Sequence, residues 1–501
     1  MDAISPNDSE YSELDTSDDE YLPSEEESDS DSPGPGNRLG LTAKQSKAHS
    51  KKRLRDDSDE QDDIPLSVLR TRLHTVDVDM LTQMLDEPMW ADVPFIVPDT
   101  TFLGEQQSLP DYLKTPYEFF KDIVTDEMIE MIETQTNIYG LQKSGKELKT
   151  SRKEIELFIG LYLRMGLVKA HNAKEYWAAD TRHPPVADEM SRNRFTTLAT
   201  HVHFVNNEEL SDQEKELDRL WKIRPWIEMH RAQLEKISQI QCQSVDEIMV
   251  AFKGRSPMKQ YIRNKPHTWG FKLWARAGSD GILHDWDVYQ GSSGKTQKKS
   301  SGASLGLSGD VVMTMTKKLA DGKNFKVFAD NFFSSLDIAN SLKDRAIWFT
   351  GTVRENRLNG CSMKTEKALK KEGRGSHDAV VEVNSNTIVV RWLDNRKVDL
   401  ISTCTGTEPM SKVTRYDKKQ KKKIEVPCPA VVQEYNQKMG GVDLTDCLTA
   451  LNKYPLKSRR WYTYIFYHSI CVSVVTAWLM YRRHCVLLRE KHMNLSQFQS
   501  A

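Results

Sequence analysis

The spacing of apolar residues divides the chain into regions with different periods. From Thr115 to about Ile240, apolar residues recur every three to four positions, which is the pattern of amphipathic helices. Ser151 precedes one such run and Glu154 completes a capping-box pattern, so a helix is predicted to begin there. Further helices are predicted at Ser191–Val205 and Asp218–Ile240. A helical pattern does not by itself indicate what this region binds.

At Ser244 the period changes to two, which is typical of strands. Strands are predicted at Ser244–Val250, Phe271–Ala277 and Ile282–Gln290, and the turn residues Gly278–Gly281 separate the last two. This part of the chain is therefore predicted to form a three-strand meander.

Helices and strands alternate after the meander. A helix is predicted at Asp310–Ala320, a strand ending at Asp330, a helix capped by Ser334 with Asp337 three residues on, and a strand at Trp348–Val353. Three strands followed by alternating units indicate an α/β fold, a mixed sheet with helices on its faces. This is the order of an RNase H-like fold, in which the first and fourth strands are neighbours.

The first part of the chain shows neither period. Residues 1–63 are rich in Ser, Asp, Glu, Pro and Gly, and the first 31 hold 13 Asp or Glu and no Lys or Arg. This composition predicts a disordered acidic tail, followed by a linker at 64–110. Ser24–Asp31 suits acid-directed kinases or a chromatin partner, and a simple solvating tail explains it equally well. Lys51, Lys52, Arg53 and Arg55 form a basic cluster of the kind that directs nuclear import.

Charge and cysteine content point to an intracellular protein with a polyanionic partner. The net charge is −2, yet residues 357–423 hold 16 Lys or Arg against 8 Asp or Glu, and such separation suggests nucleic acid. The seven cysteines form no Cys-x-x-Cys pair, so reduced thiols are expected and neither disulfides nor structural zinc. The acidic N-terminus does not resemble a secretory signal.

One apolar stretch allows two interpretations. Trp461–Met480 contains 20 residues without Asp, Glu, Lys or Arg, which is long enough to cross a membrane. Its serines, threonines, tyrosines and His468 make it only weakly apolar. We favour a buried helix of a large domain over a membrane span, and we expect no membrane partner.

Three aspartates stand out because of their surroundings. Asp246 lies within the first predicted strand, Asp330 ends the fourth, and Asp443 follows two glycines. A carboxylate in apolar surroundings is costly to desolvate unless something binds it. Taken singly, each aspartate also fits a helix cap or an ion-pair partner. Because the first and fourth strands are predicted neighbours, Asp246 and Asp330 are expected to lie together.

Carboxylates from distant parts of a chain are the ligands that a pair of hard divalent cations requires. We predict two Mg²⁺ or Mn²⁺ ions, with Asp246 bridging them, Asp330 holding one and Asp443 the other. Ions about 4 Å apart activate a water or a 3′-hydroxyl and stabilise the leaving oxygen of a phosphodiester. Asp446, one helical turn beyond Asp443, is an accessory acid. Glu247 points away from Asp246 and is interpreted as structural.

A basic and aromatic segment follows the first aspartate. Residues 248–279 contain seven basic residues and no acid, with Phe252, Tyr261 and Trp269 among them. A DNA backbone beside the carboxylates would explain this composition, and so would a solvated strand and loop. Lys418–Lys423 would add nonspecific phosphate contacts. The residues predicted to contact DNA are Lys253, Arg255, Lys259, Arg263, Lys265 and Arg354.

These motifs resemble those of the piggyBac transposases and the proteins derived from them. The resemblance covers about Leu113–Arg483. The matching stretches are Met190–Phe195, Leu220–Pro225, Ser244–Glu247, Phe252–Arg255, Tyr261–Pro266, Ala329–Phe333, Gly351–Arg354 and Tyr435–Asp446. They are long and occur in the family's order.

The resemblance implies a catalytic triad of Asp246, Asp330 and Asp443, with Asp446 as an accessory acid. It implies metal-dependent cut-and-paste transposition of double-stranded DNA by a homodimer. In that reaction water attacks at the transposon end, the freed 3′-hydroxyl forms a hairpin, and the element joins at TTAA.

The resemblance also implies a domain organisation. An RNase H-like catalytic domain would occupy 242–353 and 425–452, interrupted by a basic insertion domain at 354–424. Residues 111–241 and 453–496 would form an all-α dimerisation and DNA-binding domain, which accounts for Trp461–Met480 as a buried helix.

The sequence departs from the family pattern at its C-terminal end. Many members carry a cysteine-rich, zinc-binding module there that recognises the ends of the element, whereas this sequence has no such cysteine cluster. Two functions stay open as a result. The chain is expected to be either a shortened transposase that still cuts DNA, or a domesticated nuclear DNA-binding or chromatin factor without transposition activity.

Overall fold

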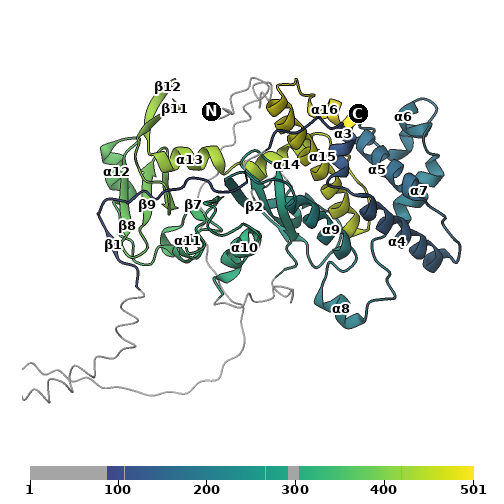
Figure 1. Ribbon diagram of the computed structural model, residues 1–501, viewed down its shortest axis with the longest axis horizontal. Helices are drawn as coiled ribbons and strands as arrows, with labels where there is room; N and C mark the ends of the chain where they lie inside the picture. Colours follow the sequence, from purple (N-terminus) through teal and green to yellow (C-terminus); the bar gives the residue numbers. More distant parts are fainter. Residues whose placement is uncertain (1–86, 106–107, 264, 266, 292–303, 419) are drawn as a thin grey trace, which may run out of the picture. The chain divides into compact units, whose positions relative to one another are not determined.

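A mixed sheet with helices on its faces organises the described part of the chain (Figure 1). The computed structural model describes residues 87–501 apart from 106–107, 264, 266, 292–303 and 419. The predicted acidic tail, the start of the predicted linker and the basic cluster at Lys51–Arg55 lie outside the described residues. The α/β fold class predicted from the sequence is confirmed.

Helices predominate in the first part of the described chain, and the sheet follows, as the change of period predicted. The helices are α3 (Pro116–Lys121), α4 (Asp126–Ser144), α5 (Arg152–Leu167), η2 (Ala173–Trp177), α6 (Pro184–Ala187), α7 (Arg192–His201), α8 (Asp212–Leu217), α9 (Arg224–Glu235), α10 (Gly306–Thr316), α11 (Leu336–Lys343), η3 (Glu355–Arg357), α12 (Glu366–Glu372), α13 (Ala430–Lys438), α14 (Gly441–Leu451), α15 (Trp461–Leu488) and α16 (Leu495–Ser500). The strands are β1 (Trp90–Ala91), β2 (Cys242–Ala251), β3 (Gln260–Tyr261), β4 (Trp269–Gly278), β5 (Leu283–Val288), β6 (Lys326–Ala329), β7 (Trp348–Thr352), β8 (His377–Glu382), β9 (Thr387–Leu393), β10 (Lys397–Ser402), β11 (Ser411–Asp417) and β12 (Lys422–Cys428).

Ten of these strands form one sheet, in the order β1-β8-β9-β10-β7-β6-β2-β4-β3, and β5 also pairs with β4. Strands β2, β4 and β5 are the predicted antiparallel meander, and β6 and β7 extend it from β2 by parallel pairing. The first and fourth predicted strands, β2 and β6, are therefore neighbours. Strands β8, β9 and β10 of the basic segment continue the same sheet beyond β7. Strands β11 and β12 form a separate two-stranded ribbon.

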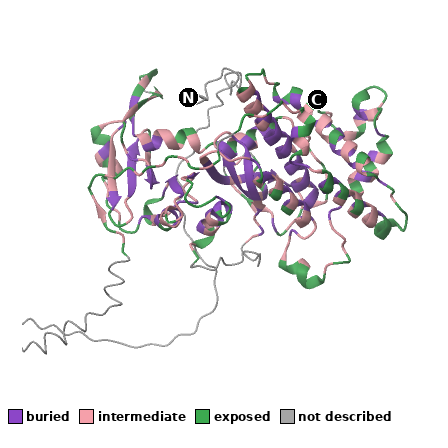
Figure 2. Ribbon diagram, in the orientation of Figure 1, coloured by how far each residue is buried: buried purple, intermediate pink, exposed green. Residues whose placement is uncertain are grey.

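Alternate residues of β2 face two different cores. Ile248 and Val250 pack into a core formed with the helical region, whereas Val245 packs into a core with α10 and α11. Helix α14 contacts β2 and β4, α15 contacts β2, and α9 contacts β5. Since side chains alternate along a strand, Asp246 shares the face of Ile248. Figure 2 shows the buried residues concentrated along the sheet and the helices against it.

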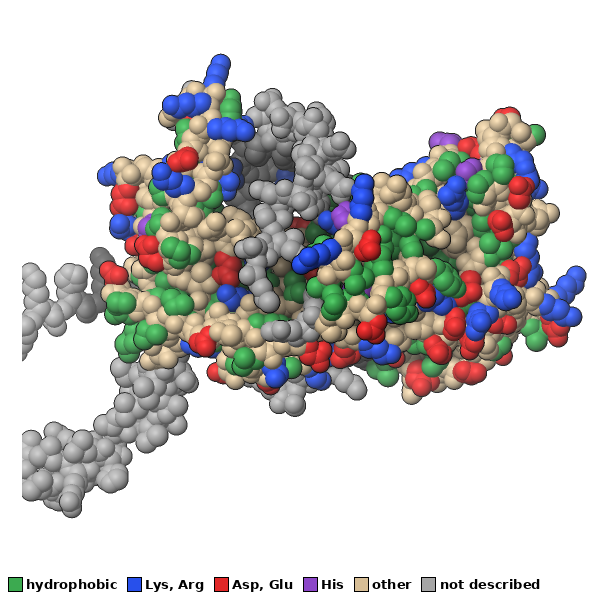
Figure 3. All heavy atoms as spheres, turned by 45° about the horizontal axis from the view of Figure 1, so that its top comes forward, with side chains coloured by type: hydrophobic (Ala, Val, Ile, Leu, Met, Phe, Trp, Pro, Cys, Tyr) green, Lys and Arg blue, Asp and Glu red, His purple; other side chains and the backbone are tan. Residues whose placement is uncertain are grey.

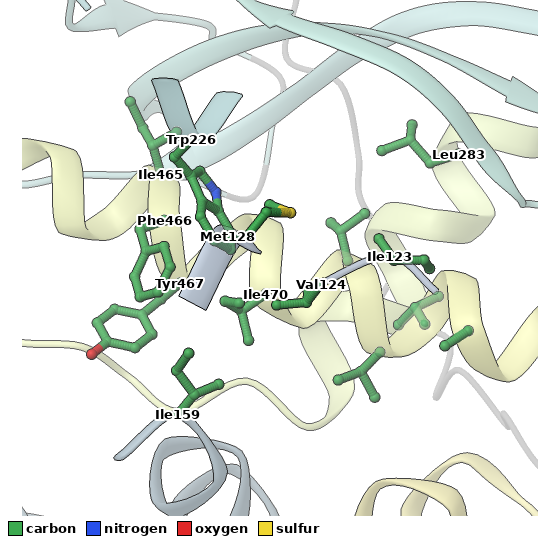
Figure 4. Close-up of a cluster of buried hydrophobic side chains, with 14 of the residues drawn as sticks. Ile123, Val124, Met128, Ile159, Trp226, Leu283, Ile465, Phe466, Tyr467 and Ile470 are labelled. Carbon is green, nitrogen blue, oxygen red and sulfur yellow. The ribbon is translucent and has the colours of Figure 1, made fainter. Parts of the chain in front are cut away.

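The long apolar helix α15 belongs to the first core. Of its most apolar 18-residue window, 83% is buried inside the structure. Trp226 of α9 packs against Phe466, with ring centroids 4.8 Å apart, and donates a hydrogen bond from Nε1 to Ser469 Oγ (2.8 Å; Figure 4). Length and composition alone would allow this helix to cross a membrane. Its burial matches the predicted core helix instead.

Two of the predicted helix caps can be compared with the structure. The side chain of Ser151 accepts a hydrogen bond from the Glu154 amide, as predicted, although the Glu154 carboxylate bonds to Arg194 rather than back to the cap. The predicted cap at Ser334 is wrong. Ser335 caps α11, and Ser334 Oγ instead donates to the Asp330 carbonyl. Ser334 therefore tightens the turn after the second aspartate.

Three predicted helices differ in their bounds. Helix α10 begins at Gly306, earlier than predicted, and α7 ends at His201. Helix α9 begins only at Arg224, because Asp218 accepts hydrogen bonds from the Leu220 amide and from Arg224 and so holds a turn. Side-chain hydrogen bonds of this kind compete with the helix, and apolar spacing does not reveal them.

Four histidines are buried in the described chain, namely His203, His230, His284 and His468. Burial lowers the pKa of each, that of His203 to about 4 and that of His230 to about 3. Each ring is neutral in the folded chain but binds a proton in the unfolded chain below its ordinary pKa of 6.5. Their stabilising contribution is present above pH 6.5 and decreases as pH falls, by up to about 1.4 kcal/mol per pH unit for each histidine.

We expect His284→Leu to weaken this dependence on pH. As pH falls from 6.5 to 5, the unfolding free energy of wild type should decrease by roughly 1–2 kcal/mol more than that of the variant. Urea unfolding at several pH values measures it. Parallel pH curves for the two proteins would contradict the expectation.

Candidate active site at the β2–β6 edge

Asp246 and Asp330 lie at equivalent places on two neighbouring strands. Strands β2 and β6 pair in parallel up to Val245 and Ala329, and the next residue in each chain segment is an aspartate. The structure thus brings together the first two predicted site residues. Their spacing in the sequence is large, and the parallel pairing alone makes them neighbours.

Both carboxylates are held in surroundings that disfavour their charge. Burial and, to a smaller extent, the neighbouring Glu247 carboxylate raise the pKa of Asp246 to about 7. Burial also raises the pKa of Asp330. Backbone amides offset part of this effect: Asp246 Oδ1 accepts from Glu247 N (2.7 Å) and Asp330 Oδ1 from Phe332 N (2.8 Å). Such carboxylates favour a proton or a bound cation.

The third aspartate reaches this edge on α14. Asp443 lies in the first turn of the helix and is exposed. The helix start is fixed against the sheet, because the Val442 amide donates to Ser244 Oγ (3.2 Å) on β2. Gly441 allows the close approach: a Cβ atom there would lie 2.2 Å from the Gly278 carbonyl oxygen. Asp446, one turn on, is half-buried, and burial raises the pKa of its carboxyl.

The charges of all three predicted catalytic aspartates act on Tyr435 of α13. Burial raises the pKa of its hydroxyl to about 12, and the charges of Asp330, Asp246 and Asp443 add to this shift. Tyr435 therefore stays protonated at neutral pH and offers an O–H donor beside them.

A lysine and a glutamate lie behind the two strand aspartates. Glu247 points to the opposite face from Asp246, where Lys272 Nζ lies 3.5 Å from its carboxylate and Lys265 Nζ 3.8 Å. Lys272 also lies over the ring of Phe332, 4.7 Å from its centroid, in the turn that carries Asp330. The Lys272 charge lowers the pKa of Asp330, whereas Glu247 raises it. Glu247 and Lys272 thus shift the pKa of Asp330 in opposite directions.

The donor set fits hard divalent cations, which prefer carboxylate oxygens. Asp246 and Asp330 are partly desolvated and Asp443 and Asp446 come from one helix, so all oxygen donors of the predicted site are present on one side of β2. In the described chain, however, no three His, Cys, Asp or Glu side chains are grouped closely enough to hold an ion as they stand. The exposed side chain of Asp443 would have to turn toward the other two.

The residues predicted to contact DNA occupy different settings. Lys253, Arg255 and Arg263 are exposed. Lys259 donates to the Gly254 carbonyl and lies over the Trp269 ring, 4.8 Å from its centroid. Lys265 is half-buried and paired with Glu247, so its charge is partly committed within the chain.

Arg354 is the predicted DNA contact nearest to the second aspartate. It is exposed, and its Nε donates to Asn331 Oδ1 (3.1 Å) beside Asp330. Arg357, which the sequence reasoning missed, donates to the Phe332 carbonyl (2.7 Å) and holds the same turn. A further basic surface lies on the β11–β12 ribbon (Figure 3), formed by Lys412, Arg415, Lys418, Lys421, Lys422 and Lys423.

Replacing Lys272 with methionine is expected to shift the pH dependence of the site. Without the ammonium group the Glu247 charge is less compensated, so the pKa of Asp330 should rise. We expect Mn²⁺ binding to require a higher pH in this variant, because a protonated carboxyl group does not hold a cation. Mn²⁺ titration at several pH values gives the binding profiles, with Lys253→Met as the exposed control. Identical profiles for wild type and Lys272→Met would exclude this role for the lysine.

The chain is similar to known transposases and to proteins derived from them. Residues 115–478 match the family described as Transposase IS4. The chain is 30% identical over 380 residues to the PiggyBac transposable element-derived protein 3 of Homo sapiens, which covers 74% of this chain and 62% of that protein. It is also 30% identical over 376 residues to the human PiggyBac transposable element-derived protein 2, with the same coverage. The chain thus spans about 62% of the length of these relatives.

A solved structure has a similar fold. The chain superposes on the cryo-EM structure of a piggyBac transposase synaptic complex with hairpin DNA with a TM-score of 0.64 and 22% sequence identity. The superposition covers 79% of this chain and 80% of that one. At this level of identity the similarity concerns the fold.

Proposed function

The chain belongs to the piggyBac-type members of the Transposase IS4 family, and from that premise we propose that it binds double-stranded DNA and cleaves phosphodiester bonds. We assign the cleavage to Asp246, Asp330 and Asp443, at the edge of an RNase H-like sheet built from β2, β4, β5, β6 and β7. The observation that carries this proposal is that Asp246 and Asp330 directly follow the paired stretches of two neighbouring strands, while the first turn of α14, which holds Asp443, is bound to Ser244 of β2.

The proposed site depends on divalent cations. Asp246, Asp330 and Asp443 would hold two Mg²⁺ or Mn²⁺ ions, with Asp446 as an accessory acid. Bound there, the ions would supply an activated water or 3′-hydroxyl and neutralise charge on the leaving oxygen. The raised pKa of Asp246 supports this assignment, because a desolvated carboxylate gains more from a cation than an exposed one does.

The chain's own residues orient the DNA in this proposal. Arg354, next to Asp330, would contact the phosphate backbone at the site, and the exposed Lys253, Arg255 and Arg263 would bind it further along. Tyr435 would donate its hydroxyl proton in a hydrogen bond to a carboxylate or a phosphate oxygen. The backbone of the Asp330 turn, held by Arg357, would keep that aspartate in place.

Cut-and-paste transposition at TTAA by a nuclear homodimer is the finer form of the proposal. The helical region and α15 would provide the dimerisation and DNA-binding surface. The relatives' names describe proteins derived from transposable elements, which favours a second candidate function, that of a domesticated DNA-binding or chromatin factor. Terminal inverted repeats flanked by TTAA around the gene would favour the transposase over the domesticated factor.

One experiment separates the two functions. DNA with a TTAA site is incubated with the chain in Mg²⁺ and in EDTA, and nicked product is measured. The transposase predicts nicks in Mg²⁺ alone, and none with Asp246→Ala. If wild type forms no more nicked product than Asp246→Ala, the domesticated DNA-binding factor is the remaining function. In that case chromatin occupancy should persist in an Asp330→Ala variant.

A further inference from the structure

A cavity of about 380 Å³ is lined by Tyr435, on which the charges of the three aspartates act. It is bordered by the turn between β9 and β10, by β11 of the ribbon, and by α13, and it is open to solvent. Its polar lining is formed by Asp394, Asn395, Arg396, Arg415, Tyr435 and Asn436. The cavity thus adjoins the basic ribbon through Arg415, and nothing in the proposed cleavage reaction uses it.

Three of these side chains have no internal role. Within the described chain, Asn395, Arg396 and Asn436 form no side-chain hydrogen bond or ion pair, and all three are exposed. Asp394, by contrast, accepts from Arg374 Nε (2.5 Å) and Arg415 Nε (3.2 Å). The cavity therefore offers two uncommitted amides and one uncommitted guanidinium, while its carboxylate is already neutralised.

This chemistry excludes several kinds of ligand. A divalent cation would need free carboxylates, and the only one here is bound by two arginines. An apolar ligand would leave the amides and the guanidinium unpaired. Asparagine amides donate and accept together, as the edge of a nucleobase requires, and guanidinium groups bind phosphate. Aromatic walls are provided by Tyr435 and Trp392.

The size and position agree with the same ligand. A volume of about 380 Å³ lies at the lower end of the range of about 300–1,000 Å³ for small-molecule sites. Tyr435 lines the cavity, and the charges of the three aspartates act on its hydroxyl. A base in the cavity would therefore belong to a nucleotide close to the phosphate at the carboxylates, and it could enter only unpaired from a complementary strand.

We infer that this cavity binds one unpaired nucleotide of a DNA strand, with Asn395 and Asn436 on the base edge and Arg396 on a phosphate. The inference rests on the proposed function, since it takes the strand at the aspartates to be DNA. Free nucleotides share the same chemistry, and the experiment distinguishes them from a strand.

The test compares strands with and without bases. Binding of the full chain to a single strand of about eight deoxyadenosines and to a deoxyribose-phosphate strand of equal length is measured by fluorescence anisotropy, in EDTA so that no cleavage occurs. We expect the base-bearing strand to bind roughly tenfold more tightly. The Asn395→Ala/Asn436→Ala double variant should reduce this ratio to about one. Asn384→Ala, an exposed asparagine away from the cavity, should keep it.

Competition by free dAMP identifies the source of the nucleotide. If dAMP displaces the strand from wild type but not from the double variant, and deoxyribose 5-phosphate does not displace it, the site is supported with a free nucleotide as its ligand. If the base-bearing strand is preferred and dAMP does not compete, the site is supported with a nucleotide of a DNA strand as its ligand. A ratio near one in wild type, or an equal ratio in the double variant, would overturn the inference. Cleavage is assayed separately in Mg²⁺. If the chain cleaves DNA but binds the two strands equally, the nucleotide site alone is refuted. If it prefers the base-bearing strand tenfold but does not cleave, only the nuclease is refuted.

Discussion

Replacing Asp246 with asparagine is expected to stop DNA cleavage and, without metal, to stabilise the folded chain above pH 7. The substitution would remove one of the three carboxylates that would hold the proposed ions, and several kcal/mol of lost transition-state stabilisation correspond to a rate reduction of about 10³-fold or more. The same carboxylate has its pKa raised from 3.8 to about 7 by burial. Folding thus favours the protonated form of Asp246. The resulting contribution to the free energy of unfolding is fully present below pH 3.8 and is lost as pH rises through about 7.

The gain in stability for Asp246→Asn above pH 7 should be on the order of 2–4 kcal/mol, measured by urea unfolding in EDTA. At pH 4 wild type and variant should be nearly equal. Asp337→Asn, at an exposed acid in the first turn of α11, is the matched control and should leave both cleavage and stability unchanged. A variant that is inactive and also less stable at pH 8 would show that Asp246 supports the fold rather than the chemistry.

Gly441→Ala is expected to separate α14 from the sheet. The new Cβ would lie 2.2 Å from the Gly278 carbonyl oxygen and 2.7 Å from Ser244 Oγ, and neither belongs to a side chain that can move far. Overpacking of this kind costs about 1–3 kcal/mol. Since Asp443 follows two residues later, a displacement of about 1 Å should also reduce cleavage about 100-fold.

Gly440→Ala provides a closely matched control. No atom lies within 4 Å of a Cβ at Gly440, and its φ of −74° suits any residue. We expect unchanged cleavage and a stability change below about 1 kcal/mol, in the stabilising direction. Unfolding and cleavage measured on both variants test the pair. Equal behaviour of the two would show that the contact between α14 and Gly278 yields without moving Asp443.

The sequence predicted the part of the site that depends on strand order. The change of period at Ser244 and the alternation after it identified β2 and β6 as neighbours, which placed Asp246 beside Asp330. The third aspartate could not be placed in this way, because α14 follows a long segment whose strands enter the same sheet. The residues around Asp443 marked it as a candidate, but only the resemblance to known transposases placed it beside the other two, and in the structure its helix is bound to β2 through Ser244.

Other residues of the site carried no signal in the pattern. Tyr435 lies in a helix of mixed polarity, and nothing in its spacing indicates that the charges of three aspartates act on its hydroxyl. Lys272 alternates as any solvated strand residue would, yet it lies over Trp274 and Phe332 and against Glu247. Both depend on contacts between distant segments, which periodicity does not encode. The Ser334 cap failed for a local reason, since two adjacent serines fit the motif equally well.

Titration of the metal-free chain with Mn²⁺ by calorimetry tests the central claim most directly, namely that Asp246, Asp330 and Asp443 form one metal centre. Wild type and Asp337→Asn should bind two ions. Each of Asp246→Asn, Asp330→Asn and Asp443→Asn should lose at least one ion or weaken binding about tenfold or more. Titration curves that are the same for wild type and all three variants would contradict the claim.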